Sequence, residues 1–289
     1  MHPDDPTSVA RAARDFSKAR MQAFWQEVWA LLTGKSIDLL RFDEVKQRLR
    51  LTDERYLGLR EIPLDKIVGS VGRYRDFTRT FLPRTNAVRS RWQRLDALAR
   101  GPEGFPPIEV YKVGEAYFVI DGNHRVSVAR QLGAKTIEAY VTELRTPVPI
   151  DENTTEKDLI QKEAYAEFLR RTRLDVLRPE AQIILTEPDH YAQLLEHISV
   201  HRYFMGIDQQ REVSWDEAVA SWYDNVYMPL VRLIREHEVL EHFPGRTEAD
   251  LYVWLIKHQE AMRLYHGGEH MTPQETVADF LSKLPEARR

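Results

Sequence analysis

The stretch from Val119 to Gly133, V-I-D-G-N-H-R-V-S-V-A-R-Q-L-G, predicts a strand, a tight turn and a helix in one short run. The apolar residues before Asp121 are β-branched or aromatic, which favours a strand, and apolar residues recur at helical spacing after the turn. Gly122 allows a backbone turn that a side chain would hinder, and Gly133 is suited to end the helix. A fold that contains this run must place a strand end directly beside a helix start.

A helix start of this kind can bind an anion. If Asn123 caps the helix, the backbone N–H groups of the next residues have no helical acceptor and point out of its end, where the helix dipole also favours negative charge. Arg125, expected to be an exposed first-turn side chain, would add donors suited to phosphate oxygens. The same pattern fits an ordinary solvated turn, since Asp-Gly is a common turn sequence and His124 could simply face solvent.

Alternating apolar runs flank this stretch. Before it stands P-P-I-E-V-Y-K-V-G-E-A-Y-F-V-I-D, which Gly114 divides into two halves that predict a β-hairpin. After it, T-I-E-A-Y-V-T-E-L alternates apolar and polar residues and predicts a further strand. The run I-P-L-D-K-I, residues 62 to 67, predicts a short strand earlier in the chain.

Together these motifs resemble the ParB/sulfiredoxin superfamily over roughly residues 60 to 145. In ParB-type domains a Gly-Glu-Arg-Arg-like turn binds nucleotide phosphates, and a Gly-Cys-His-Arg-like turn does so in sulfiredoxins. Gly122, His124 and Arg125 fit the positions that the two patterns share. The resemblance implies an α+β fold class with a ParB/sulfiredoxin-like small mixed sheet and helices. The sequence pattern after this region predicts an all-helical C-terminal domain.

The resemblance also implies a ligand, a nucleoside triphosphate with Mg²⁺. The binding residues that it implies belong to the turn and to the loop after the first strand: Gly122, Asn123, His124, Arg125, Arg73 and Arg75. Asp121 resembles the acidic residue of free-serine kinases on the same fold, which makes it the candidate Mg²⁺ ligand. Asp121 and His124 are the candidate catalytic residues, and both a nucleotide hydrolase and a small-molecule kinase remain open.

Two departures from the family patterns narrow the chemistry. The chain has no cysteine, so the thiol-dependent sulfiredoxin reaction is excluded, as are disulfides and cysteine-ligated zinc. Asn123 stands in place of the acidic residue of the ParB turn, which leaves the choice of nucleotide open.

The charge of the chain is unevenly distributed. Of a formal net charge of -4, residues 151 to 289 contribute -10 (16 Lys and Arg against 26 Asp and Glu), which leaves +6 for residues 1 to 150. Residues 73 to 100 hold eight arginines against two aspartates. Such a run is typical of a solvated helix face, but arginine also suits phosphate contacts. A DNA-associated regulator of transcriptional or partition type is therefore the second hypothesis, although no helix-turn-helix pattern is evident.

The pattern divides the chain into three parts: an N-terminal helical extension over residues 1 to 58, the ParB/sulfiredoxin-like domain over 59 to 147, and a helical C-terminal domain over 148 to 289. Residues 7 to 33 predict one amphipathic helix with a core or docking face. Capping signals such as Ser214 with Glu217 predict the C-terminal helices. We expect a protein partner or a homodimer to use these helical regions.

No membrane is expected among the partners. No apolar run approaches the roughly 20 residues that span a bilayer, and the start M-H-P-D-D-P lacks the features of a signal peptide. We therefore expect a cytoplasmic protein. A third hypothesis is a non-catalytic interaction module in which the turn binds no ligand.

Overall fold

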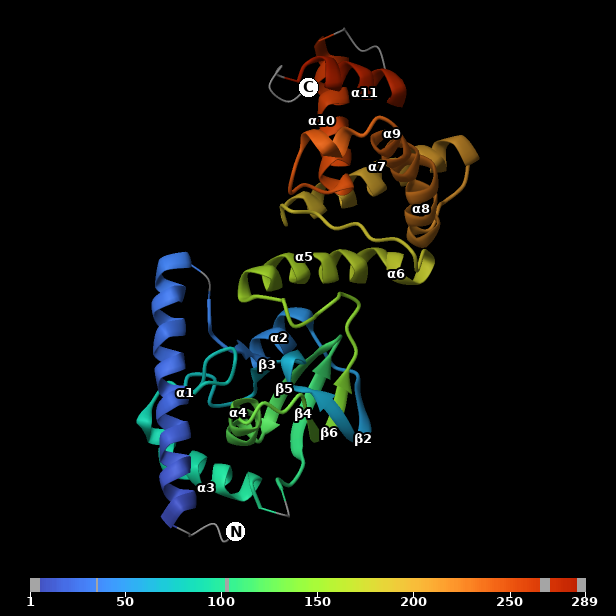
Figure 1. Cartoon of the computed structure of the whole chain (residues 1–289). Helices are drawn as coiled ribbons and strands as arrows, with labels where there is room; N and C mark the ends of the chain where they lie inside the picture. Colours follow the sequence, from blue (N-terminus) through green and yellow to red (C-terminus); the bar gives the residue numbers. More distant parts are fainter. Residues whose placement is uncertain (1–5, 35, 102–103, 266–270, 285–289) are drawn as a thin grey trace. The chain divides into compact units, whose positions relative to one another are not determined.

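A computed structural model describes residues 6–34, 36–101, 104–265 and 271–284. It divides into two compact units, an N-terminal unit of residues 1–159 and a C-terminal unit of residues 160–289 (Figure 1). The N-terminal unit contains the sheet and helices α1 to α4, whereas the described C-terminal unit is helical. The three-part domain division expected from the sequence stays a prediction about which segments fold independently.

The N-terminal unit alternates short strands and helices. The single strand expected over residues 62 to 67 is wrong, because these residues contain the end of one strand, a 3₁₀ turn and the start of another strand. The helix expected over residues 7 to 33, the hairpin, and the strand after the turn are all confirmed. The elements are α1 (Pro6–Thr33), β1 (Leu40–Arg41), α2 (Phe42–Leu49), β2 (Glu54–Pro63), η1 (Leu64–Lys66), β3 (Ile67–Ser70), η2 (Asn86–Val88), α3 (Arg89–Ala99), β4 (Ile108–Val113), β5 (Ala116–Asp121), α4 (Asn123–Gln131) and β6 (Thr136–Leu144).

The six strands form one mixed sheet in the order β1-β3-β5-β4-β6-β2. Strands β4 and β5 are the antiparallel hairpin, β3 lies parallel to β5, β6 lies parallel to β4, and β2 closes the far edge antiparallel to β6. Strand β5, which leads into the turn, is therefore held between two neighbours. This topology, together with the helical C-terminal unit, confirms the expected α+β class with a small mixed sheet.

Helices cover both faces of this sheet. On one face, the core joins residues of α1, α3 and α4 to the inward residues of the strands, and Phe16, Trp92 and Val126 are fully buried there. On the other face, the ring of Phe42 from α2 stacks on Tyr111 of β4, with 4.3 Å between ring centroids. The sheet is thus the central layer of the unit, and α4 is fixed against it over its buried side.

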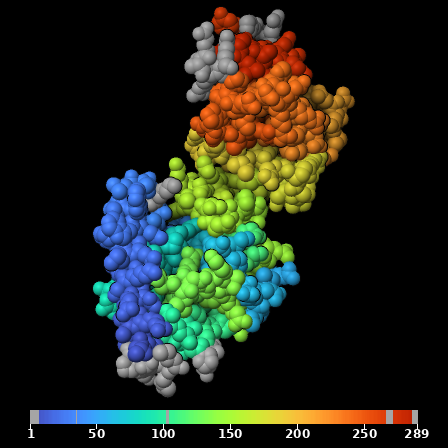
Figure 2. Space-filling view, viewed as in Figure 1, coloured from blue at the N-terminus to red at the C-terminus, as the bar shows by residue number. Residues whose placement is uncertain are grey.

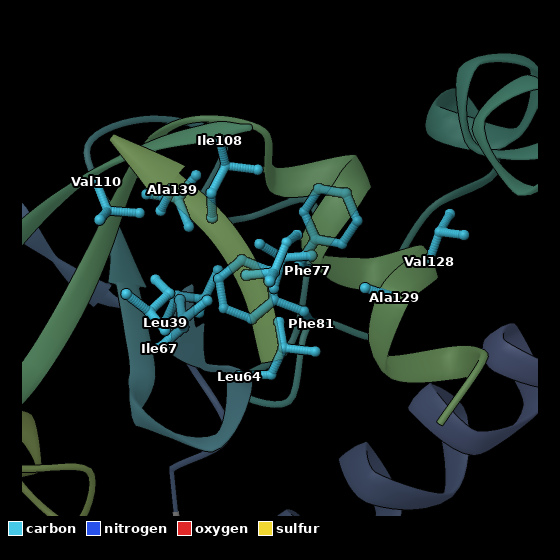
Figure 3. Packing of buried hydrophobic residues seen from close by; sticks show 14 of the residues in the cluster. Leu39, Leu64, Ile67, Phe77, Phe81, Ile108, Val110, Val128, Ala129 and Ala139 are labelled. Carbon is cyan, nitrogen blue, oxygen red and sulfur yellow. The ribbon is translucent and has the colours of Figure 1, made fainter. Parts of the chain in front are cut away.

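The irregular loop between β3 and α3 is part of this core. Its two phenylalanines, Phe77 and Phe81, are fully buried, and Figure 3 shows them between the strands and α4. Backbone hydrogen bonds close the loop on itself, from Thr78 N to Leu82 O at 2.9 Å and from Arg84 N to Asp76 O at 2.8 Å. The loop that carries Arg73 is therefore held in place from within.

The C-terminal unit consists of helices joined by loops, and its described residues contain no strand. The apolar run I-I-L at 183 to 185 predicts a short strand, but these residues are irregular in the structure. The elements, of which the first begins before residue 160, are α5 (Glu156–Thr172), α6 (Leu174–Leu177), α7 (His190–Gln209), α8 (Trp215–Trp222), the π-helical turn η3 (Tyr223–Tyr227), α9 (Met228–Glu236), η4 (Val239–His242), α10 (Glu248–Tyr265) and α11 (Pro273–Ser282).

Capping residues set the starts of these helices as the sequence predicts. Ser214 accepts a hydrogen bond from the backbone N–H of Glu217, and the Glu217 carboxylate accepts one in return from Ser214 N. Thr272 and Glu275 form the same reciprocal pair at the start of α11. In the described part of the chain, no helix is long and apolar enough to span a membrane.

One buried hydrogen bond ties α3 to α4 and gives a stability prediction. The Nε1–H of Trp92 donates to Oγ of Ser127 at 2.9 Å, and both side chains are buried. We expect Ser127→Ala to lower the free energy of unfolding by about 1 to 3 kcal/mol, because the indole N–H loses its acceptor. The control is Ser17→Ala on the exposed side of α1, which should change stability by no more than about 0.5 kcal/mol. Urea unfolding of both variants would measure this, and equal changes would contradict it.

Candidate functional site

The turn between β5 and α4 is built around a glycine. Gly122 is the N-cap of α4 with φ of 116°, and a Cβ atom placed on it would lie 2.4 Å from Cγ2 of Ile108. Only glycine fits both the backbone and the space. The expectation that Asn123 caps the helix is wrong: Asn123 is the first helical residue, since the carbonyl of Gly122 already accepts from Val126 N at 3.0 Å.

The start of α4 faces a pocket of about 360 Å³. This volume lies within the range of about 300 to 1,000 Å³ that is usual for small-molecule sites. The residues that line the pocket come from the turn, the loop after β3, helix α3 and the segment before β4: Gly72, Arg73, Arg91, Leu95, Pro106, Ile120, Asp121, Gly122, Asn123, His124 and Arg125. All the site residues predicted from sequence are thus brought together except Arg75, which is not among the residues lining this pocket.

Arg125 is not the exposed side chain that the sequence predicts. Only 12% of its side chain is exposed. Its guanidinium donates to the carbonyls of Pro106 and Pro107, at 2.8 and 2.6 Å, and forms an ion pair with Asp121. Arg125 therefore fastens the segment before β4 to the helix start, and both terminal nitrogens of its guanidinium are already engaged.

Two other arginines direct positive charge toward the pocket. Arg73 has a left-handed backbone, with φ of 55°, and its half-exposed side chain lies 3.3 Å from Asp76. Arg91 of α3 is exposed and has no ion-pair partner among the described residues. The sequence pattern includes Arg91 only as one member of the basic run, because nothing local shows that α3 packs beside the turn. Leu95, one helical turn later, lines the same pocket, which is the helical spacing expected of one face.

His124 is buried at the base of this positive region, with 5% of the residue exposed and its ring edge against Phe77. Burial, and then the charges of Arg91 and Arg73, lower the pKa of His124 to about 4. The imidazole is therefore neutral near pH 7. The alternative of a solvated His124 is wrong, because the residue is buried.

Asn123 leaves one polar atom unsatisfied beside the pocket. Its Nδ2 donates to the carbonyl of Gly72 at 3.4 Å, whereas its buried Oδ1 has no hydrogen-bond partner in the structure. Buried polar atoms are nearly always paired. An acceptor of this kind, at a pocket lining, fits a ligand or water that brings a donor.

The fit of the site to a metal rests on Asp121 alone. Its side chain is 59% exposed at the pocket and is ion-paired with Arg125. Among the described residues, no group of three or more histidines or carboxylates could hold a metal ion by itself. Mg²⁺ is commonly held by one or two carboxylates together with substrate phosphates and water, so the residues fit Mg²⁺ only as part of a phosphate complex.

The basic run over residues 73 to 100 is less open than its composition suggests. Arg84 lies 3.1 Å from the carboxylate of Glu27, and Arg100 forms an ion pair with Asp15. Arg79 is turned inward and donates to two backbone carbonyls. Part of this positive charge is therefore neutralised or buried within the N-terminal unit, and the part at Arg73 and Arg91 lies at the pocket.

Solved structures similar to this chain come from both families that the sequence resembles. A sulfiredoxin from Arabidopsis thaliana matches with 24% identity and a TM-score of 0.24, covering 30% of this chain and 86% of the sulfiredoxin. A Pnob8-like ParB-N domain matches with 13% identity and a TM-score of 0.21, covering 82% of this chain and 93% of that domain. No protein-family model and no curated protein matches the chain. The role of each residue follows from this chain's own geometry.

The contacts of Arg125 predict a structural effect of its loss. We expect Arg125→Ala to destabilise the protein by about 1.5 to 3 kcal/mol, the range for hydrogen bonds to charged groups, because two carbonyls and Asp121 lose their donor. Arg94→Ala, an exposed arginine of α3 that does not line the pocket, is the matched control and should change stability by no more than about 0.5 kcal/mol. Urea unfolding of the full chain measures both. If Arg125→Ala changed the free energy of unfolding as little as the control does, the structural role of the Arg125 hydrogen bonds would be wrong.

The buried His124 predicts a pH dependence of stability. Its pKa is about 4 in the folded chain and about 6.5 in an unfolded one. Between these two pH values the unfolded chain binds a proton at His124 and the folded chain does not. The stability that comes from a neutral, buried His124 is therefore full above pH 6.5 and is lost as the pH falls to about 4. We expect melting temperatures of His124→Gln to fall less steeply over this window than those of the native protein. Parallel curves for the two proteins would contradict the assignment.

Proposed function

We propose that the N-terminal unit binds a nucleotide through its phosphates at the start of α4. The observation that carries this proposal is the arrangement of charge around the pocket. The first residues of α4, together with Arg73 and Arg91, line it, while Asp121 is the only acidic residue among the lining residues described. Such a site is complementary to an anion.

The pocket residues would divide the work between binding and support. The backbone N–H groups at the start of α4 would donate to phosphate oxygens, and Arg91, which has no competing ion pair in the described chain, would add a charged fork of donors. Neutral His124 can present an N–H without carrying charge into the core. Arg125 would keep the wall at Pro106 in place rather than contact the ligand.

The remainder of the pocket suits the uncharged part of a nucleotide. Leu95, Pro106 and Ile120 offer apolar surface against which a base or sugar could pack. The unpaired Oδ1 of Asn123 would accept a hydrogen bond from a hydroxyl or amino group of the ligand. Small-molecule sites commonly combine such apolar walls with a few fixed polar groups.

Mg²⁺, when bound with the nucleotide, would neutralise phosphate charge, and Asp121 is the residue that would hold it. The carboxylate of Asp121 is paired with Arg125 in the structure. Hydrolysis or transfer to a small-molecule hydroxyl is the activity that Asp121 would serve from this position, since phosphoryl transfer depends mainly on positioning and electrostatics. His124, neutral and buried, would act there as a hydrogen-bond donor.

DNA binding through residues 73 to 100 has less support. Arg84, Arg100 and Arg79 are engaged within the protein, so fewer charges are free for a DNA backbone than the sequence suggests. Binding to duplex DNA that falls steeply with rising salt would favour this alternative. An interaction module without ligand is the remaining alternative, and it predicts no nucleotide binding.

The proposal predicts ligand-dependent stability. A nucleoside triphosphate with Mg²⁺, screened against the full chain, should raise the melting temperature, since a ligand at 100 times its Kd stabilises the folded state by about 2.7 kcal/mol. Arg91→Ala should leave the melting temperature of the free protein unchanged and reduce the shift. Arg94→Ala, on the same helix but away from the pocket, should keep the shift in full.

Each part of the proposal has an outcome that opposes it. No shift with any nucleotide, with or without Mg²⁺, would leave the interaction module as the better account. A full shift in Arg91→Ala would place the ligand elsewhere. Asp121→Asn distinguishes metal binding from phosphate binding. In this variant the rise in melting temperature with nucleotide should no longer depend on Mg²⁺. An unchanged dependence on Mg²⁺ would show that Asp121 is not the metal ligand.

A further inference from the structure

Helix α1 has two apolar faces, and the fold uses only one of them. Its inward face, with Phe16, Ala19 and Ala23, is buried against the N-terminal unit. A second apolar surface, formed by the C-terminal half of the helix, covers its opposite side and extends onto its flanks, taking 3.6 residues per turn. The members of this outward face, with their exposed fractions, are Met21 (64%), Phe24 (53%), Trp25 (54%), Trp29 (63%), Leu31 (87%) and Leu32 (73%). Figure 2 shows α1 as a dark-blue column exposed along the N-terminal unit.

We propose that the outward face of α1 is a homodimer interface in which two copies of α1 pack antiparallel. Scattered exposed apolar residues need no explanation, but a contiguous apolar patch marks an interaction surface. Three exposed aromatic side chains on one short stretch of helix, including two tryptophans, are the residue types that concentrate at interface centres.

The size of the outward face suits a partner of the same kind. With full side-chain areas on the order of 150 to 250 Å², its exposed fractions amount to roughly 700 Å² per copy. A stable interface buries about 800 Å² per partner. The face is therefore large enough to supply most of such an interface, and a two-fold axis makes a single face sufficient for both partners.

The charges along α1 select the antiparallel arrangement. The same side of the helix carries Arg14 and Lys18 in its N-terminal half and is uncharged from Met21 to Leu32. The last turn of α1 contains no basic residue. Antiparallel pairing about the middle of the apolar stretch brings Lys18 toward the C-terminal end of the partner's helix, where the dipole favours a cation. Parallel pairing would instead place the basic residues of the two copies side by side.

Hollows on both sides of α1 can accept the edges of a partner helix. One, of about 580 Å³, lies beside Trp25 and Trp29 and is bounded by Leu82. The other, of about 530 Å³, lies beside Leu31 and Ile37. A helix packed on the outward face would direct its outermost side chains into these hollows, as ridges of one helix enter grooves of another.

A lipid surface is the other occupant that an exposed amphipathic helix could have, and the flanks of the face disfavour it. Helices that lie in membrane interfaces are rich in lysine and arginine on the polar face beside their apolar one. Here the borders hold Gln22, Gln26 and Glu27, and Glu27 already pairs with Arg84. A second copy, which needs no such cations, fits these borders better.

The mass of the full chain in solution tests the interface. Size-exclusion chromatography with light scattering, over a dilution series, should show a dimer that dissociates on dilution. Trp25→Glu with Trp29→Glu should give a monomer with unchanged helical content by circular dichroism, because both side chains are exposed. Phe204→Glu on α7 is the matched control, since its ring is 57% exposed on another helix, and it should remain dimeric.

Cross-linking tests the antiparallel order, because the native chain has no cysteine. The variant with both Met21→Cys and Leu32→Cys should be joined into covalent dimers by a short thiol cross-linker, since position 21 of one copy lies opposite position 32 of the other. Either single variant should not, because equal positions would be about 16 Å apart along the helix at 1.5 Å per residue. Cross-linking of the single variants would overturn the antiparallel order.

Three results would overturn the interface itself. The native chain could be monomeric at every concentration, or its dimer could survive the double glutamate substitution, which would place the contact elsewhere. Binding to phosphatidylglycerol vesicles that the double substitution abolishes, in a monomeric chain, would assign the face to a membrane. None of these results bears on nucleotide binding, because no residue of the outward face lines the pocket at α4.

Discussion

The ion-paired guanidinium of Arg125 is the contact on which the candidate site depends. It binds the carbonyls of Pro106 and Pro107 from one segment and the carboxylate of Asp121 from another, while its own backbone belongs to the first turn of α4. Three stretches of chain meet at one planar group whose geometry allows several hydrogen bonds at once. The pocket has a fixed wall because of this contact. An arginine that the sequence pattern assigns to ligand binding thus holds the wall of the pocket in place.

The local parts of this arrangement can be predicted from the sequence, and the tertiary parts cannot. A strand, a glycine turn and a helix follow from periodicity and from the special backbone of Gly122, and these local signals agree with the observed fold. The engaged state of Arg125 depends on a proline segment that folds back over the turn. The position of Arg91 at the pocket depends on the packing of α3 beside α4. Neither of these tertiary contacts can be predicted from the residues next to Arg125 or Arg91 in the sequence.

The distribution of positive charge also could be predicted only in part from the sequence. The run over residues 73 to 100 reads as a basic stripe, but the fold gives several of its arginines internal partners, such as Glu27 for Arg84. Burial, and then the cations that stay beside the pocket, lower the pKa of the His124 imidazole. The result is a local positive field in a chain whose net charge is -4. The sequence gives the number of charged residues, and the fold determines which of them are paired and which lie at the pocket.

The two edges of the sheet have a consequence for how the protein can assemble. Free strand edges are templates for pairing with other chains, and natural sheets blunt them with short strands, bulges and charges. Strand β1 has two residues, and β2 is interrupted by a bulge between Tyr56 and Gly58. The exposed side chains of β2 include Arg55 and Glu61. Sheet extension into fibres is thereby discouraged at both ends, so the edge strands of one copy are poor templates for the strands of another.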